Sequence, residues 1–165
     1  MSEIQTPVVE SGKPQKDVKK EIMEWVKSIL IALVIVAFVR TFLFTMIRVD
    51  GESMLETLKD GDRLAATIID GKLFGYNRGE VVILTYPGAD HYCVKRIIGL
   101  PGEIIEIKSG DVYINGELLE EPYITHKSRD SMNAYQIPEG AYFVMGDNRV
   151  VSLDSRRVGP VEAGP

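Results

Sequence analysis

Cysteine and histidine are scarce in this chain of 165 residues. The one cysteine, Cys93, excludes an intrachain disulfide, so the fold must be held together by its hydrophobic core. The two histidines, His91 and His126, do not combine with cysteine at the spacing of a zinc site. We therefore expect neither a metal ion nor another cofactor.

Basic residues are also too few to give the chain a positive charge. Nineteen Lys and Arg stand against 24 Asp and Glu, a formal net charge of -5, which argues against a nucleic-acid partner. Internal repeats and low-complexity tracts are lacking as well. The composition, 45% hydrophobic and 26% charged, is that of a folded protein, and the length allows one membrane anchor and one modest domain.

The longest apolar run lies near the N-terminus. Residues 28–39, "SILIALVIVAFV", carry no charge, and after Arg40 the run resumes as "TFLFTMI". Together these segments approach the roughly 20 residues of a membrane-spanning helix, and an arginine near the end of such a helix can reach the interface. We predict a single transmembrane anchor over residues 25–47; a buried core helix is the alternative.

The lysines around this run predict its orientation. Residues 1–24 mix Pro, Gly, Ser, Gln and charged residues without apolar periodicity, which is typical of a solvated tail. Five lysines precede the apolar block: Lys13, Lys16, Lys19, Lys20 and Lys27. The positive-inside rule then makes the tail cytoplasmic and residues 48–165 extracytoplasmic, as in a retained signal anchor on the cell membrane.

The segment after the anchor has the pattern of β-structure. Short β-branched or aromatic runs are separated by Gly, Pro, Asp and Asn, and Asn115-Gly116 is typical of a type I′ hairpin turn. We expect a mainly β fold, an antiparallel sandwich or partly closed barrel. The predicted strands lie in "RLAATIID", "EVVILTY", "HYCVKRIIG", "EIIEIKSG", "DVYINGELL" and "AYFVMGD".

Ser53 stands in a glycine-containing turn, "VDGESMLETL", just beyond the predicted anchor. A serine in a polar turn is usually a cap or turn former, and a catalytic serine needs a neighbour that takes its proton. His91 and His126 are candidates by residue type, although surface or strand positions are the more ordinary interpretation of both.

Lys95 is a further candidate for the base, because it lies in the strand pattern "HYCVKRIIGLPGE". Alternation places Lys95 on one face with Cys93 and Ile97 and places Arg96 on the other, so one of two adjacent basic residues must point inward. A buried lysine has a lowered pKa and can act as a general base. The spacing alone does not decide which of the two is buried.

A third polar cluster follows the strand pattern "AYFV". The segment "MGDNRVVSLDSRRVG" holds matched acidic, basic and hydroxyl side chains, which can fix a loop by charge-assisted hydrogen bonds and orient an amine. A purely structural loop is the alternative. The residues concerned are Asp147, Asn148, Arg149, Ser152, Asp154, Ser155 and Arg156.

Taken together, the anchor and these clusters resemble the bacterial type I signal peptidases, which use a serine–lysine dyad, in their compact Gram-positive-like form. The resemblance runs from about Trp25 to Gly159. It rests on three ordered boxes, "GESMLETL", "VKRIIGLPGE" and "GDNRVVSLDSRRVG".

The resemblance implies a role for each site residue. Ser53 is the nucleophile and its backbone N–H the first oxyanion donor; Gly51 offers no side-chain donor; Lys95 is the general base. Ser152 orients the lysine amine, and Met54 contacts the substrate or the lipid surface. The residues that support the site are Asp147, Arg149, Asp154 and Arg156.

The resemblance also implies the activity. We expect a monomeric membrane-bound endopeptidase that removes signal peptides from preproteins after small-x-small sites at the surface of the lipid bilayer. Three features depart from the family pattern: Glu56 stands where proline is usual, two valines precede Ser152, and the sequence ends at "VGPVEAGP" where relatives usually continue. They leave open a paralogue that binds signal peptides without cleaving them. A self-cleaving repressor-type protease is disfavoured because the chain has no DNA-binding segment.

Overall fold

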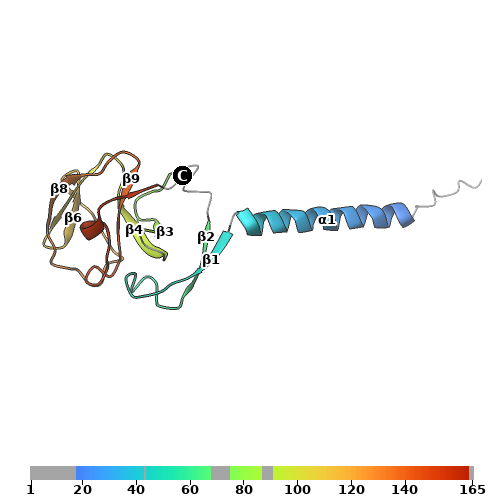
Figure 1. Ribbon diagram of the computed structural model, residues 1–165, viewed down its shortest axis with the longest axis horizontal. Coiled ribbons are helices and arrows are strands. Elements are labelled where there is room, and N and C mark those ends of the chain that lie inside the picture. The colour runs from blue at the N-terminus through green and yellow to red at the C-terminus, as the bar shows by residue number, and fades with distance from the viewer. Residues whose placement is uncertain (1–17, 43, 68–74, 87–90, 164–165) are drawn as a thin grey trace, which may run out of the picture. The chain divides into compact units, whose positions relative to one another are not determined.

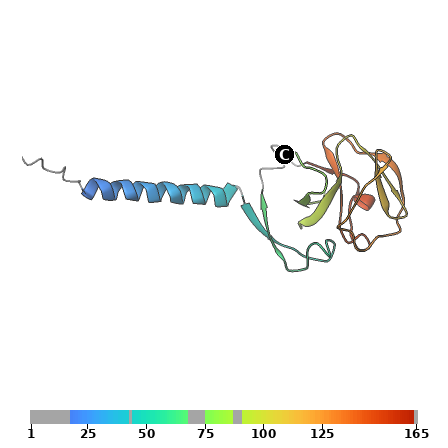
Figure 2. The ribbon, with the colours of Figure 1, turned by 180° about the vertical axis from the view of Figure 1, so that it is seen from behind.

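The computed structural model describes residues 18–42, 44–67, 75–86 and 91–163 (Figure 1). The chain divides into two compact units, Met1–Val39 and Arg40–Pro165, which are described separately below. The first contains most of a long helix and the second contains the strands, as both ribbon views show (Figures 1 and 2).

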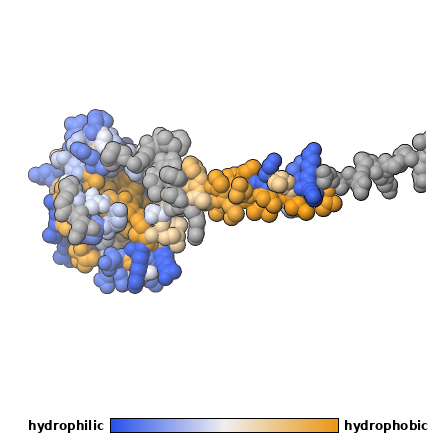
Figure 3. Space-filling model, turned by 45° about the vertical axis from the view of Figure 1, so that its right-hand side comes forward, coloured by the Kyte–Doolittle hydropathy of each residue, from blue (hydrophilic) through white to orange (hydrophobic). Residues whose placement is uncertain are grey.

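Helix α1, Val18–Phe42, is built from the apolar run and the polar residues before it. Its apolar side chains are open to the surroundings; those of Ile29, Leu33 and Phe38 are 57–62% exposed. Figure 3 shows hydrophobic surface along much of the helix, with hydrophilic residues gathered towards its N-terminal end. Within the described residues, no helix satisfies both the length and the apolar content required of a membrane span.

The helix boundaries differ from the sequence expectation. The helix begins inside the segment expected to be a tail and ends at Phe42, whereas the apolar run was expected to remain helical through Ile47. Strand β1, Phe44–Arg48, takes the last part of that run, because its backbone pairs antiparallel with β2, Arg63–Thr67. A β-branched and aromatic composition favours this pairing over continued helix.

The remaining strands form two four-stranded sheets in the orders β10-β9-β4-β3 and β7-β6-β5-β8. Every strand pair in the described part of the chain is antiparallel, which confirms the expectation of a mainly β fold. The strands are β3 Val81–Leu84, β4 Cys93–Gly99, β5 Ile104–Lys108, β6 Asp111–Ile114, β7 Glu117–Leu118, β8 Met132–Gln136, β9 Ala141–Met145 and β10 Val161–Glu162; a short helix, α3, spans Ser155–Val158.

The predicted hairpin turn is confirmed. Ile114 pairs with Glu117 across a two-residue loop, and both loop residues, Asn115 and Gly116, have positive φ angles of 52° and 87°. A type I′ turn requires positive φ at both central positions, which Asn-Gly adopts at little cost. The same logic closes the β5–β6 hairpin at Ser109-Gly110.

The hydrophobic core lies between the two larger sheets. It combines Ile98, Ile105, Ile107, Val112, Ile114, Ile137, Ala141, Phe143 and Met145. Strand β4 contributes to this core with one face only. Its other face carries Lys95, opposite Val82 of β3, and Ile97, opposite Val144 of β9. The strand alternation therefore directs Lys95 away from the main core.

Candidate active site

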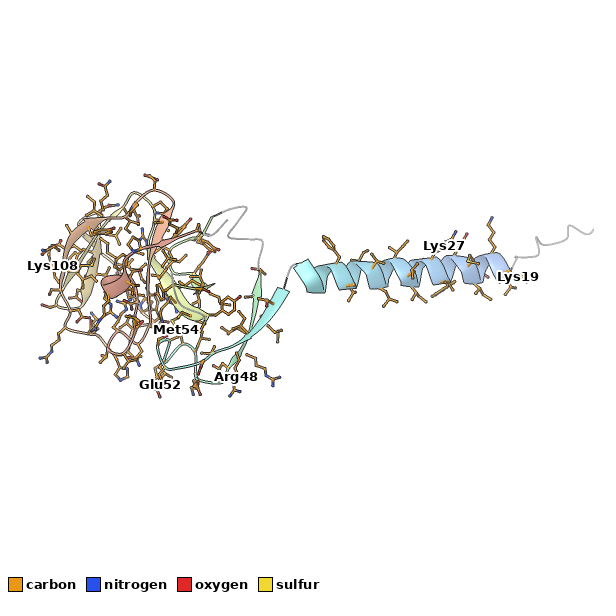
Figure 4. All side chains as sticks on the ribbon, viewed as in Figure 1. Lys19, Lys27, Arg48, Glu52, Met54 and Lys108 are labelled. Atoms are coloured by element: carbon orange, nitrogen blue, oxygen red, sulfur yellow. The ribbon has the colours of Figure 1, made fainter. Side chains whose placement is uncertain are left out.

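Ser53 lies in the connection between β1 and β2. Two backbone hydrogen bonds close this connection at its base, from Val49 N–H to the Asp62 carbonyl and from Gly61 N–H to the Val49 carbonyl. Met54, next to the serine, is 1% exposed and anchors the segment (Figure 4). The nucleophile candidate is thus held by its neighbours, while Ser53 itself remains half-buried.

Lys95 reaches Ser53 from strand β4. Its Nζ lies 2.8 Å from Oγ of Ser53, and the lysine is 3% exposed. The structure therefore brings together the serine and the lysine that the sequence suggested. Arg96 points to the opposite face, where it is paired with Asp147. Of the two adjacent basic residues, Lys95 is the buried one, and within the described residues it forms no ion pair.

The surroundings of Lys95 favour its neutral form. Burial lowers the pKa of the Lys95 amine, because desolvation penalises the ammonium. The nearby charge of Arg156 acts in the same direction, whereas Cys93 and Asp154 oppose it. A lysine with a lowered pKa, in hydrogen-bond contact with a serine hydroxyl, has the chemistry of a general base beside a nucleophile.

Gly146 is the first residue of the third box, "GDNRVVSLDSRRVG", called the final box below, and it packs against the segment around Ser53. A Cβ built on this glycine would lie 2.3 Å from Ser152 Oγ and 2.4 Å from the Ser53 carbonyl oxygen, so only glycine fits between them. Backbone and side-chain donors of Asn148 reach the carbonyls of Ser53 and Glu52, at 3.0 and 3.2 Å. These contacts join two segments that are distant in the sequence.

Ser152 is buried beside this junction, but its contacts differ from the expectation. Its Oγ forms no hydrogen bond of standard geometry among the described residues, although its interaction with Asp154 helps to lower the pKa of that carboxyl. The expected bond to the amine of Lys95 is not formed in this conformation. The amine contacts Ser53 instead, while the Ser152 side chain packs against Gly146.

Asp154 and Arg156 form the first of three ion pairs that support the site. Arg156 donates from Nε and Nη2 to the two carboxylate oxygens of Asp154, at 2.8 and 2.9 Å, and Asp154 also accepts from the Gly146 N–H at 3.0 Å. Burial opposes ionisation of Asp154, but Arg156 and the Gly146 N–H outweigh it and lower its pKa. The carboxylate caps helix α3 and fixes the loop that carries Ser152.

Asp147 and Arg96 form the second pair. Arg96 donates from Nε and Nη2 to the two oxygens of Asp147, at 2.9 and 2.5 Å, and Thr57 Oγ1 donates to the same carboxylate at 2.5 Å. The two-point contact between Arg96 and Asp147 therefore joins strand β4, which carries Lys95, to the final box. Thr57 joins the segment around Ser53 to the same carboxylate. Such two-point arginine contacts fix geometry as well as charge.

Arg149 also has a partner outside its own box. Its Nη1 donates to Glu121 at 2.9 Å, its Nη2 donates to the other oxygen of Glu121, and its Nε donates to the Gly146 carbonyl at 3.1 Å. Sequence reasoning placed Arg149 in a supporting role but did not identify Glu121. The only signal was a run of polar residues, "EEPY", after a predicted hairpin.

The residues around Ser53 in the box "GESMLETL" shape the loop and leave one backbone donor available. Met54 was expected to contact the substrate or lipid, but at 1% exposure it offers almost no surface and serves to anchor the loop. Gly51 has a φ of +91° and donates its N–H to Asp60 Oδ1 at 2.9 Å, so it shapes the turn. The Ser53 N–H has no hydrogen-bond partner within the described residues, which leaves it available as a donor.

The remaining candidates form no hydrogen bond to Ser53 or Lys95 among those found in the described residues. His91 and His126 are exposed, and Cys93 is half-buried. Over the described residues, no group of three or more His, Cys, Asp and Glu side chains is arranged to hold a metal ion. A cavity of about 360 Å³ opens on the sheet face that carries Lys95, and its lining includes Tyr76, Val82, Leu84, Tyr142, Val144 and Val161.

Comparison with known proteins gives a consistent result. A family described as signal peptidase, peptidase S26, matches residues 22–164. The chain is 41% identical to signal peptidase I S of Bacillus subtilis over 84% of this chain and 80% of that protein. It is 40% identical to signal peptidase IB of Staphylococcus aureus over 87% of this chain and 84% of that protein.

A solved structure is also similar. The crystal structure of a signal peptidase I from Enterococcus faecalis is 33% identical and covers 53% of this chain and 89% of its own, with a TM-score of 0.48.

Proposed function

Because the chain belongs to the signal peptidase family, peptidase S26, and is a serine protease of that family, we propose that it removes N-terminal signal peptides from secreted preproteins. We propose further that Ser53 is the nucleophile and Lys95 the general base. The observation that carries this assignment is the 2.8 Å contact between Lys95 Nζ and Ser53 Oγ. The buried setting of the amine supports it.

In the first half of the reaction, neutral Lys95 takes the proton of the Ser53 hydroxyl. The serine oxygen attacks the carbonyl carbon of the scissile peptide bond, and the free backbone N–H of Ser53 donates to the oxyanion that forms. The ammonium of Lys95 then protonates the leaving amine, so the peptide bond breaks and an ester remains on Ser53. Lys95 is neutral again at the end of this step.

The second half repeats the chemistry with water. Lys95 takes a proton from a water molecule, the resulting hydroxide attacks the ester carbonyl, and the proton returns to the serine oxygen as the ester breaks. The products are the signal peptide, with a free carboxylate, and the mature chain, with a free amine.

Ser152 is proposed to orient the Lys95 amine. A Cβ on Gly146 would lie 2.3 Å from Ser152 Oγ and 2.4 Å from the Ser53 carbonyl oxygen. Both serines therefore pack against the same glycine, which supports a role for Ser152 in the site. Because Ser152 Oγ forms no hydrogen bond of standard geometry among the described residues, the hydroxyl is able to accept from the amine during turnover. Asp147, Arg149, Asp154 and Arg156 hold the surrounding segments in place.

We propose that α1 anchors the protein in the cell membrane, with its N-terminus cytoplasmic and the strand-containing unit outside. The exposed apolar side chains of α1 support this proposal, since such a surface is unfavourable in water. Lys19 and Lys27 lie in its N-terminal part, as the positive-inside rule expects (Figure 4). Alkaline carbonate extraction and protease protection of intact cells test both statements.

The assignment is tested by cleavage of a detergent-solubilised precursor that has an Ala-x-Ala site. Wild-type protein, Ser53→Ala and Lys95→Ala are compared across pH, with the exposed Lys108→Ala as a matched lysine control (Figure 4). We expect cleavage by wild type and Lys108→Ala only. Retained cleavage by Ser53→Ala would refute the dyad, and peptide binding without turnover by wild type would favour a silent binding protein.

A further inference from the structure

We propose that Glu121 is a positioning residue of the serine–lysine site, acting on both halves of the site through Arg149 and Tyr123. This inference rests on the proposed function. Glu121 belongs to none of the three boxes and lies in the connection between β7 and β8. The proposal is carried by the hydrogen bonds and ion pair that converge on its carboxylate.

The Glu121 carboxylate is the meeting point of two side chains. It accepts two hydrogen bonds from the guanidinium of Arg149 and one from the hydroxyl of Tyr123, at 2.9 Å. The side chains of Glu121 and Arg149 are only 8% and 2% exposed. A buried charge needs its partner, so the position of the guanidinium depends on the carboxylate.

The first branch leads to the serine side of the site. Arg149 uses its third donor, Nε, to hold the Gly146 carbonyl at 3.1 Å. Gly146 is the residue that separates Ser152 Oγ from the Ser53 carbonyl oxygen with no space for a Cβ. A shift of the guanidinium therefore moves the backbone against which both serines pack.

The second branch leads to the lysine side. The guanidinium of Arg96 lies 4.0 Å from the centre of the Tyr123 ring, and it donates to both oxygens of Asp147. Burial raises the pKa of Tyr123, so its hydroxyl stays protonated and donates to Glu121. Because Arg96 adjoins Lys95 in β4, the ring and the carboxylate brace the strand from which the amine projects.

These contacts indicate that Glu121 acts by holding neighbouring segments in place, rather than by a direct effect of its charge on Lys95. The charged or titratable groups with the largest effects on the Lys95 amine are Cys93, Asp154 and Arg156, whereas the carboxylate of Glu121 is bonded to Arg149 and Tyr123. Loss of the Glu121 charge should therefore change the site through displacement of Gly146 and β4. A displaced site admits water to Lys95, and water favours the ammonium.

The test uses the full chain in detergent with Glu121→Gln, which keeps the size of the side chain but removes its charge. We expect kcat to fall roughly tenfold or more while KM stays within about twofold, since misplaced groups lose rate rather than binding. The acid limb of the pH profile should move upward by about half a unit. The adjacent exposed Glu120→Gln is the matched control and should behave as wild type.

A second readout does not require cleavage. NMR titration of the Lys95 amine, assigned with Lys95→Arg, should give a higher pKa in Glu121→Gln than in wild type and an unchanged one in Glu120→Gln. If wild type fails to cleave, the proposed function fails, and this titration still decides the role of Glu121. Glu121→Asp keeps the negative charge, so its kcat and its Lys95 pKa should lie between those of wild type and Glu121→Gln.

A lowered melting temperature with unchanged kcat, pH profile and Lys95 titration would overturn the proposal and leave Glu121 as a structural ion-pair partner. If Glu121→Gln does not fold, Tyr123→Phe provides the same comparison, because it keeps the ring under Arg96 and removes one hydrogen bond to the carboxylate. In Tyr123→Phe the pKa of the Lys95 amine should also be higher than in wild type, by a smaller amount than in Glu121→Gln. An unmoved titration in a folded Tyr123→Phe would also count against the proposal.

Discussion

The amine of Lys95 lies 2.8 Å from the hydroxyl of Ser53, although 42 positions separate the two residues in the sequence. Strand β4 supplies the lysine from the face that points away from the main core, and the β1–β2 connection supplies the serine. The lysine is buried, and within the part of the chain that the structure describes it forms no ion pair.

Cleavage should depend on pH through Lys95. Burial lowers the pKa of its amine below the ordinary value of 10.5, and only the neutral amine can take the serine proton. Activity should therefore be lost as pH falls through this lowered pKa and should reach a plateau below pH 10.5. The kcat/KM profile of a peptide substrate measures the transition; an acid limb at or above pH 10.5 would contradict a buried base.

The same lysine should cost the protein stability at neutral pH. Its folded pKa is lowered and its unfolded pKa is not, so the unfolded state binds more protons between the two values and stability rises with pH there. Lys95→Met should increase the free energy of unfolding at neutral pH, and the gain should shrink as pH approaches 10.5. Urea unfolding of both proteins at matched pH values checks the sign, and a gain that grows with pH would contradict it.

Gly146→Ala should impair both packing and cleavage. The added Cβ would meet Ser152 Oγ at 2.3 Å and the backbone oxygen of Ser53 at 2.4 Å. We expect a loss of about 1–3 kcal/mol of stability and a fall in kcat of roughly tenfold or more. Gly140→Ala is the control, because no atom lies within 4 Å and only its φ of +77° is unfavourable. Equal activity of the two variants would contradict the close approach.

Asp154→Ala should destabilise the fold strongly. It leaves the buried guanidinium of Arg156 with only the half-exposed carboxylate of Asp130 as an ionic partner among the described residues, and it removes the acceptor of the Gly146 N–H. The expected loss is about 3–5 kcal/mol. Because the folded pKa of Asp154 is lowered, its contribution is present above pH 3.8 and disappears as pH falls through the folded value. Wild type and variant should therefore differ least in strong acid.

Ser152→Ala should separate activity from stability. Its Oγ forms no hydrogen bond of standard geometry in the described residues, so its removal should change the free energy of unfolding by less than about 1 kcal/mol. Cleavage should fall roughly tenfold or more if the hydroxyl orients the amine. Ser155→Ala gives the opposite pattern, because Ser155 Oγ accepts from the Val144 N–H at 3.0 Å. A large stability loss in Ser152→Ala with full activity would contradict this role.

Much of the fold could be predicted from local patterns. The Asn115-Gly116 turn and the β-branched runs specify hairpins, because positive φ angles and alternating burial are properties of a few neighbouring residues. Strand β8, Met132–Gln136, was not predicted, since its residues are largely exposed and its pairing with β5 decides its conformation. The strand at Phe44–Arg48 was assigned to the helix for the same reason: a partner strand, absent from any local window, decides its conformation.

The order of the residues along the chain was enough to identify which side chains have the right chemistry and that they occur in three ordered boxes. It could not decide whether Lys95 or Arg96 is the buried base, because strand alternation separates the two without saying which face is covered. Tertiary structure decided this, by pairing Arg96 with Asp147 and leaving Lys95 beside Ser53. The role of Glu121 also came only from the fold. The reason is physical: burial and hydrogen-bond partners are set by segments distant in sequence, whereas turns and strand periodicity are set locally.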